Sequence, residues 1–244
     1  MRLLLTLLLG TVLPAALGAQ SLENRVLQLA DGTVHLSFAA RPGVCGSGTN
    51  VNIGHEANDW EYQCAPQSVR VALEIQGQRV RKVRTYVGGR WRLGAAATDI
   101  GSVRPGEAAR FFLALAERGS DLVGDPVLPA ALADSVTIWP SLLKLARMSR
   151  LPEERRRTAT FWLGQDAAAE AGKALDSIAG DPSGDREVRR QAVFALSQRH
   201  GEGVPALIRI ARSNPDPELR KTALFWLGQS DDPRALDLFE EILR

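Results

Sequence analysis

The amino-acid sequence predicts an α+β protein, in which a small antiparallel β domain precedes a short α-solenoid built from helix pairs. Two patterns predict this class. In the N-terminal part apolar residues alternate with polar ones, as in half-buried strands, and in the C-terminal half one block of residues returns three times. We therefore divide the chain into a leader at residues 1–19, a β-rich domain at 20–103, leading helices at 104–150 and three helical repeats at 151–244.

The first 19 residues are typical of a secretory signal peptide. A basic start at Arg2 is followed by an apolar run, and the run ends in the small residues of Leu17-Gly18-Ala19. The run is short for a bilayer span, although an uncleaved membrane anchor is the alternative. We expect cleavage after Ala19, an exported protein in the periplasm or outside the cell, and no membrane span in the mature chain.

Export changes the expected state of the two cysteines, Cys45 and Cys64. An isolated pair in an oxidising compartment most simply forms a disulfide. The bond closes a loop of 19 residues. Closing such a loop stabilises a fold by about 3 kcal/mol, because it restricts the unfolded chain. A metal or redox role is the alternative, but the two residues have no CxxC spacing and no nearby histidine ligands.

Two hairpins are predicted in the β domain. Alternating residues on either side of Asp31-Gly32 predict the first, with strands at 25–29 and 33–38. The second has the clearest alternation in the chain, from Val69 to Ile75, a turn at Gln76-Gly77-Gln78, and a return strand at 80–87. Three basic residues lie on the return strand and a fourth, Arg79, directly precedes it, which indicates one solvated face.

From Pro105 the period of the apolar residues becomes helical. Pro105 suits the first turn of a helix that ends near Gly119. A short helix within residues 125–134 and another from Trp139 or Pro140 to Met148 follow. We expect these helices to form a degenerate leading repeat that caps the array.

The repeated block occupies residues 156–165, 189–198 and 220–229. The equivalent alanines Ala159, Ala192 and Ala223 are 33 and 31 residues apart, which suits one helix–turn–helix unit per repeat. Acidic and proline residues precede each block, as at helix N-termini. Second helices are predicted at about 167–179, 204–211 and 234–243.

This pattern resembles the short bacterial HEAT repeats, also called phycobilisome-lyase-like. The likeness is best in Pro215-Asp216-Pro217-Glu218-Leu219-Arg220 and in Asp231-Asp232-Pro233-Arg234-Ala235, and it covers residues 151–244. The resemblance implies the fold. It does not determine the function, because such arrays serve as scaffolds, as bilin lyases and as a di-iron deoxyhypusine hydroxylase. That hydroxylase carries several His-Glu dipeptides, whereas this chain has only His55-Glu56, outside the repeats. The resemblance therefore implies no metal site here.

A helical wheel separates two sets of residues on the first helices of the repeats. Ala159, Leu163 and their equivalents define the buried side. The arginines Arg156, Arg189 and Arg220 lie at its rim, where we expect them to bridge to acidic turn residues of the preceding repeat. A second stripe lies roughly opposite the apolar centre. We call it the Phe strip, and it consists of Phe161, Phe194 and Phe225 with Arg157, Arg190 and Lys221.

Two explanations fit the Phe strip. Phenylalanine on a polar helix face is ordinary once, but here it recurs at the repeat period. The rings either pack between neighbouring repeats or, with the basic residues, form a surface that binds another protein.

The sequence contains no recognisable catalytic motif. It has no GxSxG elbow and no phosphate-binding loop, and its net charge of +2 gives no concentrated basic excess of the kind that binds nucleic acid. We predict no catalytic residues, no metal, no cofactor, and an exported protein-interaction scaffold or adaptor with an unidentified protein partner. The alternative is an enzyme or accessory factor, lyase-like or metal-dependent, at the junction of the two parts. Its candidate residues are His55, Glu56, Asp59, Asp99 and Trp139.

Overall fold

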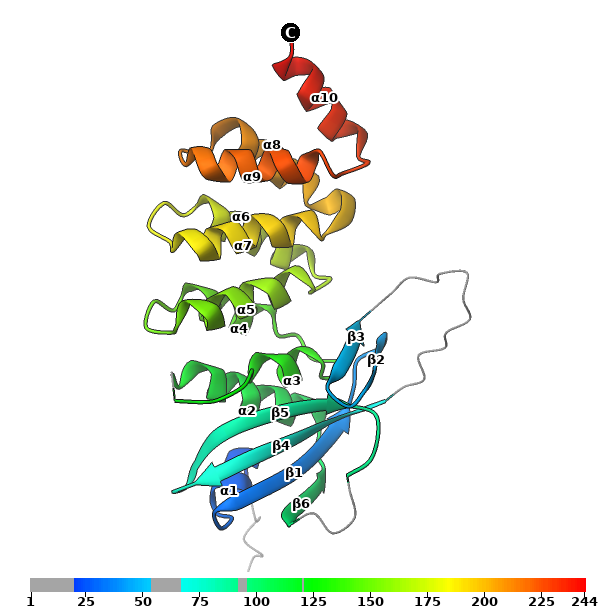
Figure 1. Ribbon diagram of the computed structural model, residues 1–244, viewed down its shortest axis with the longest axis vertical. Coiled ribbons are helices and arrows are strands. Elements are labelled where there is room, and N and C mark those ends of the chain that lie inside the picture. Colours follow the sequence, from blue (N-terminus) through cyan, green and yellow to red (C-terminus); the bar gives the residue numbers. More distant parts are fainter. Residues whose placement is uncertain (1–19, 54–66, 92–95, 120) are drawn as a thin grey trace, which may run out of the picture.

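In the computed structural model, residues 20–53, 67–91, 96–119 and 121–244 are described, and they form a sheet domain at one end of a stack of helices (Figure 1). The fold is thus α+β, with the strands in the N-terminal part and the helical array after them. The leader at 1–19 lies outside these residues, as do His55, Glu56, Asp59 and Cys64.

The main sheet has four strands in the order β5-β4-β1-β6. Their bounds are β1 Gly32–Ala39, β4 Ser68–Gln76, β5 Arg79–Val87 and β6 Ala97–Ser102. β4 pairs antiparallel with β1 and β5, but β6 pairs parallel with β1, so the expectation of a purely antiparallel domain is wrong. The residues of β6 are mostly polar and exposed, and they carry no alternation from which the strand could be recognised.

The second predicted hairpin is confirmed. β4 and β5 are joined at Gly77 and Gln78, whose φ angles of 59° and 56° are left-handed and suit a two-residue turn. The alternating apolar residues of β4 are buried. On the same side of the sheet Phe38 of β1 packs against Phe112, with ring centroids 6.2 Å apart. The inner face of the sheet is therefore joined to the core of the first long helix.

The first predicted hairpin is wrong. Residues of its first strand lie in helix α1, Leu22–Leu27, which Ser21 caps by accepting a hydrogen bond from the Asn24 N–H. Leu22 and Val26 are buried at the i, i+4 spacing of one helix face, and that spacing prevails over the apparent alternation. Asp31 accepts a hydrogen bond of 2.8 Å from the Gly77 N–H and so ties the β4–β5 turn to the start of β1.

A small hairpin carries the first cysteine. Its strands are β2, Val44–Ser47, and β3, Asn50–Ile53. Cys45 is buried on β2. Because Cys64 lies outside the described ranges, the Cys45–Cys64 disulfide stays a prediction.

The helices begin and end within a few residues of the expected positions. The three leading helices are α2 Pro105–Glu117, α3 Val127–Ala131 and α4 Trp139–Arg147. The repeats follow as α5 Glu153–Gly164, α6 Ala169–Gly180, α7 Arg186–Ser197, η1 His200–Glu202, α8 Val204–Ser213, α9 Pro217–Leu227 and α10 Pro233–Ile242.

The array has two layers. α5, α7 and α9 lie side by side in one layer, and α4, α6, α8 and α10 follow one another in the other (Figure 1). α4 packs against α5, so it takes the place of a second helix of a preceding repeat. The helices of the first layer approach closely. A Cβ atom added at Gly164 would lie 2.7 Å from the Cβ of Ala195.

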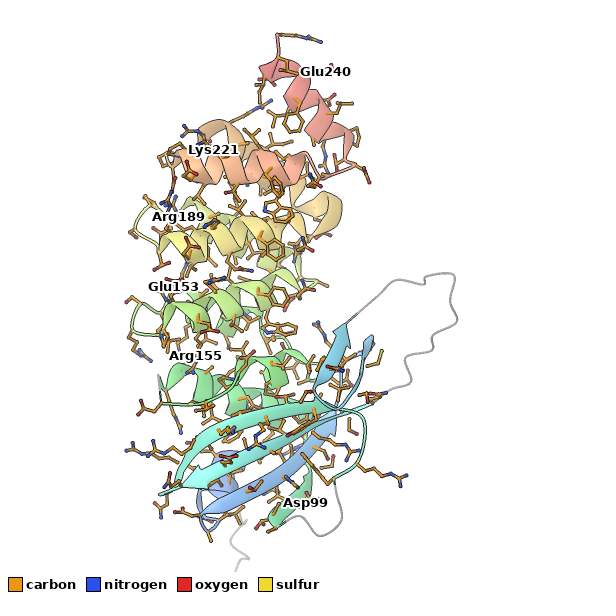
Figure 2. The ribbon with its side chains drawn as sticks, viewed as in Figure 1. Asp99, Glu153, Arg155, Arg189, Lys221 and Glu240 are labelled. Atoms are coloured by element: carbon orange, nitrogen blue, oxygen red, sulfur yellow. The ribbon has the colours of Figure 1, made fainter. Side chains whose placement is uncertain are left out.

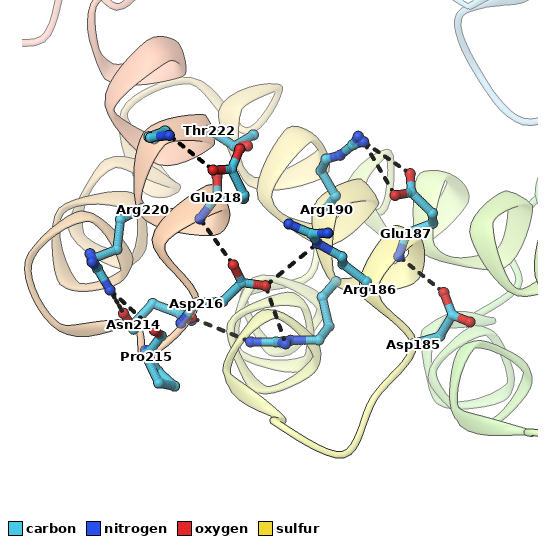
Figure 3. Close-up of polar contacts among 12 residues, drawn as sticks. Asp185, Arg186, Glu187, Arg190, Asn214, Pro215, Asp216, Glu218, Arg220 and Thr222 are labelled. Carbon is cyan, nitrogen blue, oxygen red and sulfur yellow. Dashed lines mark hydrogen bonds and ion pairs between the residues drawn. The ribbon is translucent and has the colours of Figure 1, made fainter.

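Arginine and aspartate side chains join consecutive repeats. Arg156 of α5 donates to Asp185, and Arg189 of α7 lies 3.8 Å from Asp216. Figure 3 shows Asp185 beside Glu187 and Asp216 beside Glu218, in the turns before α7 and α9. Each aspartate also caps the helix that it precedes, because it accepts a backbone N–H of that helix. The bridges thus reach the turn of the following repeat, and the expected direction, toward the preceding repeat, is wrong. Arg220 instead donates to the carbonyl oxygens of Asn214 and Pro215 within its own turn.

Arg189 is the most deeply placed of these arginines. It is buried, and it also donates to the Ala179 carbonyl and to the Asn214 side chain, both at 3.3 Å. Arg186 lies at the same 3.8 Å from the same carboxylate oxygen of Asp216, but its side chain is 61% exposed. The two arginines therefore differ mainly in burial.

Replacing Arg189 with methionine should destabilise the protein by about 3 kcal/mol, because the change removes the hydrogen bonds of a buried guanidinium to Ala179 and Asn214 and its ion pair with Asp216. Arg186→Gln is the matched control and should cost less than about 0.5 kcal/mol, since exposed ion pairs contribute little. Urea denaturation followed by far-UV circular dichroism measures both changes. Equal losses for the two variants would contradict the structural role of Arg189.

Candidate protein-interaction surface

The first helix of each repeat shows the same line of side chains. A basic residue, a phenylalanine and a glutamine stand four residues apart, so they lie along one side of the helix. The lines are Arg157/Phe161/Gln165 along α5, Arg190/Phe194/Gln198 along α7 and Lys221/Phe225/Gln229 along α9, with each glutamine just after the end of its helix. Because α5, α7 and α9 lie side by side, the three lines form one surface. Figure 2 labels Glu153 of α5 and Lys221 of α9 on the same side of the array.

The basic residues of the Phe strip are exposed and paired within their own helices. Arg157 lies 3.9 Å from Glu153, Arg190 lies 3.2 Å from Glu187, and Lys221 lies 2.9 Å from Glu218. Such exposed pairs contribute about 0–1 kcal/mol to stability. The three basic residues can therefore be replaced without loss of the fold.

The three phenylalanines differ in their surroundings. Phe161 meets Trp162 of its own helix edge-on, with ring centroids 5.2 Å apart. The ring of Phe194 packs against Trp226 of the next repeat, with ring centroids 5.1 Å apart. Phe225 packs against the same Trp226, with ring centroids 5.0 Å apart. Phe161 and Phe194 are half-buried, whereas Phe225 is 59% exposed. Packing between repeats thus accounts for Phe194, whereas the ring of Phe225 stays open to solvent.

A cavity of about 410 Å³ adjoins these rings at the C-terminal ends of α7 and α9. We call it the inter-repeat cavity. Its walls include Gln198 of α7, Trp226 of α9, and Gln229, Asp231 and Asp232 after α9. The wheel places Gln198 and Gln229 beside the phenylalanines. The cavity itself depends on how α9 stacks on α7 and on the turn before α10, which a wheel of single helices does not contain.

Asp232, one of the carboxylates that line the inter-repeat cavity, caps helix α10. It accepts the Arg234 N–H at 3.0 Å, and the Arg234 guanidinium lies 2.6 Å from its other oxygen. The hydrogen bonds from the Arg234 side chain lower the pKa of Asp232 to about 2. The ionised form therefore stabilises the folded state above the ordinary pKa of an aspartate, and this contribution is lost as the pH falls toward 2.

Replacing Arg234 with glutamine should raise the pKa of Asp232 toward the ordinary value of 3.8, because the guanidinium that favours the carboxylate is gone. Titration of the Asp232 carboxyl carbon by NMR measures the change. Arg186→Gln, which removes an arginine from another capping aspartate, should leave the Asp232 midpoint where it is. An unchanged midpoint in the Arg234→Gln variant would show that the guanidinium does not determine it.

The structure describes two residues of the alternative junction site, Asp99 and Trp139, and they lie on separate elements. Asp99 lies on β6, paired with His35 of β1, at the end of the molecule away from the helical array (Figure 2). Trp139 begins α4 within the array. The remaining candidates, His55, Glu56 and Asp59, fall outside the described ranges. In the ranges that the structure describes, no cluster of potential metal ligands is found, and no helix has the length and apolar character to cross a membrane.

The geometry defines a two-layer α-solenoid of helix pairs with an aligned surface on one layer. Comparison with known families agrees for the last two repeats, since residues 182–244 match the model of HEAT repeats. A search of curated proteins finds no match to this chain. The helical part is thus similar to HEAT repeats, while the finer likeness to the phycobilisome-lyase-like type stays a prediction.

Proposed function

We propose that the protein is an exported, non-catalytic scaffold or adaptor, and that its helical array binds another protein through the Phe strip. The observation that carries the proposal is the alignment of three equivalent lines of basic, aromatic and amide side chains on neighbouring helices. HEAT repeats commonly act as protein-interaction scaffolds, and an array of this kind offers a broad surface without a catalytic pocket. The signal-peptide pattern of residues 1–19 supports export.

The charge distribution of the strip supports a protein partner. Three exposed cations stand at the repeat period along one edge, each next to an exposed or half-buried ring. Arginine and aromatic residues are enriched at the centres of protein interfaces, because they supply large contact areas and directed hydrogen bonds. The exposed Phe225 is the strongest candidate for an anchor, since its ring is not enclosed by its own repeat.

The proposal predicts the behaviour of a triple charge reversal, Arg157→Glu, Arg190→Glu and Lys221→Glu. The protein from Gln20 onward, immobilised and exposed to an envelope extract, should retain a stoichiometric partner that this variant loses. The melting temperature should change by no more than a few degrees, because the three ion pairs are exposed.

A second triple variant, Lys173→Glu, Arg209→Glu and Arg212→Glu, is the matched control. It reverses one lysine and two arginines on α6 and α8, in the other layer, where all three side chains are exposed. Retention of the partner by this control, with loss in the strip variant, is the expected result. Loss in both variants, or retention in both, would contradict the assignment of binding to the Phe strip.

A further inference from the structure

The inter-repeat cavity is electrically suited to a cation. α7 and α9 both end at it, and the C-terminal end of a helix carries partial negative charge from its unpaired carbonyl groups. Neither helix has a basic residue in its last turn, whereas α4 and α8 of the other layer do. The two negative helix ends at the cavity thus lack the basic last-turn residue that α4 and α8 carry.

The arginines near the cavity already have hydrogen-bond partners, and those of Arg234 lie in the cavity wall. Arg199, which follows α7, is buried and donates to the carbonyl oxygens of Asp166 and Ala168 in the preceding repeat and to Glu202. Arg234 donates to Asp232 and to the Gly201 carbonyl. Asp231 is exposed at the cavity and has no hydrogen bond or ion pair within the described part of the chain. Its carboxylate is therefore the one that remains for an incoming cation.

The side chains in the wall of the inter-repeat cavity also suit a guanidinium and a peptide backbone. Trp226 offers an aromatic surface, and a guanidinium stacks on such a ring while its N–H groups reach a carboxylate. Gln198 and Gln229 stand at equivalent positions of consecutive repeats, and both line the cavity. Each side-chain amide has both donors and an acceptor, which suits the alternating groups of an extended peptide backbone.

We propose that the inter-repeat cavity binds an arginine side chain from an extended segment of a protein partner. The guanidinium lies between Trp226 and Asp231 at the negative ends of α7 and α9, and the amides of Gln198 and Gln229 hydrogen-bond to the backbone of the segment. The identity of the segment as part of a partner rests on the proposed scaffold function. The preference of the cavity for a guanidinium rests on the cavity alone.

Fluorescence anisotropy with a fluorescein-labelled hexa-arginine peptide tests the preference, with a hexa-citrulline peptide as the uncharged isostere. The hexa-arginine peptide should bind to the protein from Gln20 onward, and the citrulline peptide should bind at least about tenfold more weakly, because charge-assisted hydrogen bonds are lost. Asp231→Asn should weaken arginine binding about fivefold, as expected for loss of one partly exposed ionic contact. Gln229→Ala should weaken both peptides.

Asp99→Asn is the matched control, since it makes the same change on β6 at the other end of the molecule, where an amide oxygen can still accept the Gly101 N–H. It should leave arginine binding unchanged. Equal weakening by Asp231→Asn and Asp99→Asn, or equal binding of the two peptides, would overturn the proposal, because either result means unspecific attraction.

The partner-capture experiment separates this proposal from the scaffold function. Capture that depends on the Phe strip, with neither capture nor peptide binding affected by Asp231→Asn, would overturn the cavity proposal and leave the scaffold function intact. Arginine-specific binding through Asp231 without any captured partner would support the preference of the cavity and contradict the scaffold function.

Discussion

The contact between the buried arginine of one repeat and the capping aspartate of the next holds the helical array in register. Asp185 and Asp216 each cap their own helix and also contact the preceding repeat, since Asp185 accepts a hydrogen bond from Arg156 and Asp216 forms an ion pair with Arg189. Burial raises the pKa of Asp185, but the Val188 N–H and the Arg156 guanidinium outweigh it, so the pKa lies below the ordinary range. The pKa of Asp216 is lowered first by the Glu218 N–H and then by its arginines. Both residues are therefore carboxylates at neutral pH.

The other end of the first layer is tied by a different set of arginines. Arg199 donates to backbone carbonyls of the loop after α5, and Arg234 donates to the Gly201 carbonyl after α7. Arg199 thus ties the turn after α7 to the loop after α5, and Arg234 ties the start of α10 to the turn after α7. These contacts lie at the ends of the helices that carry the Phe strip, where Gln198 and Gln229 line one cavity. We infer that the candidate surface depends on the same contacts that hold the stack together.

Local patterns predicted much of this structure. The β4–β5 hairpin and the repeat helices follow from alternation, helical spacing and capping residues, each of which acts over a few residues. α1 was missed because six residues satisfy an i, i+4 pair and a β-like alternation equally well, and β6 because its residues are polar and exposed. The direction of the arginine bridges and the inter-repeat cavity depend on how α9 stacks on α7. That arrangement is a tertiary property, and the wheel of one helix does not contain it.

The most direct test of this account is a double-mutant cycle between Arg189 and Asp216, which joins α7 to the start of α9. Arg189→Met and Asp216→Asn are suitable changes, because asparagine still caps a helix while it removes the charge. The account predicts a coupling free energy of about 1–2 kcal/mol from the urea denaturation of the wild type, both single variants and the double variant. A coupling near zero would mean that the two side chains stabilise their helices independently, and the register of the array would then need another cause.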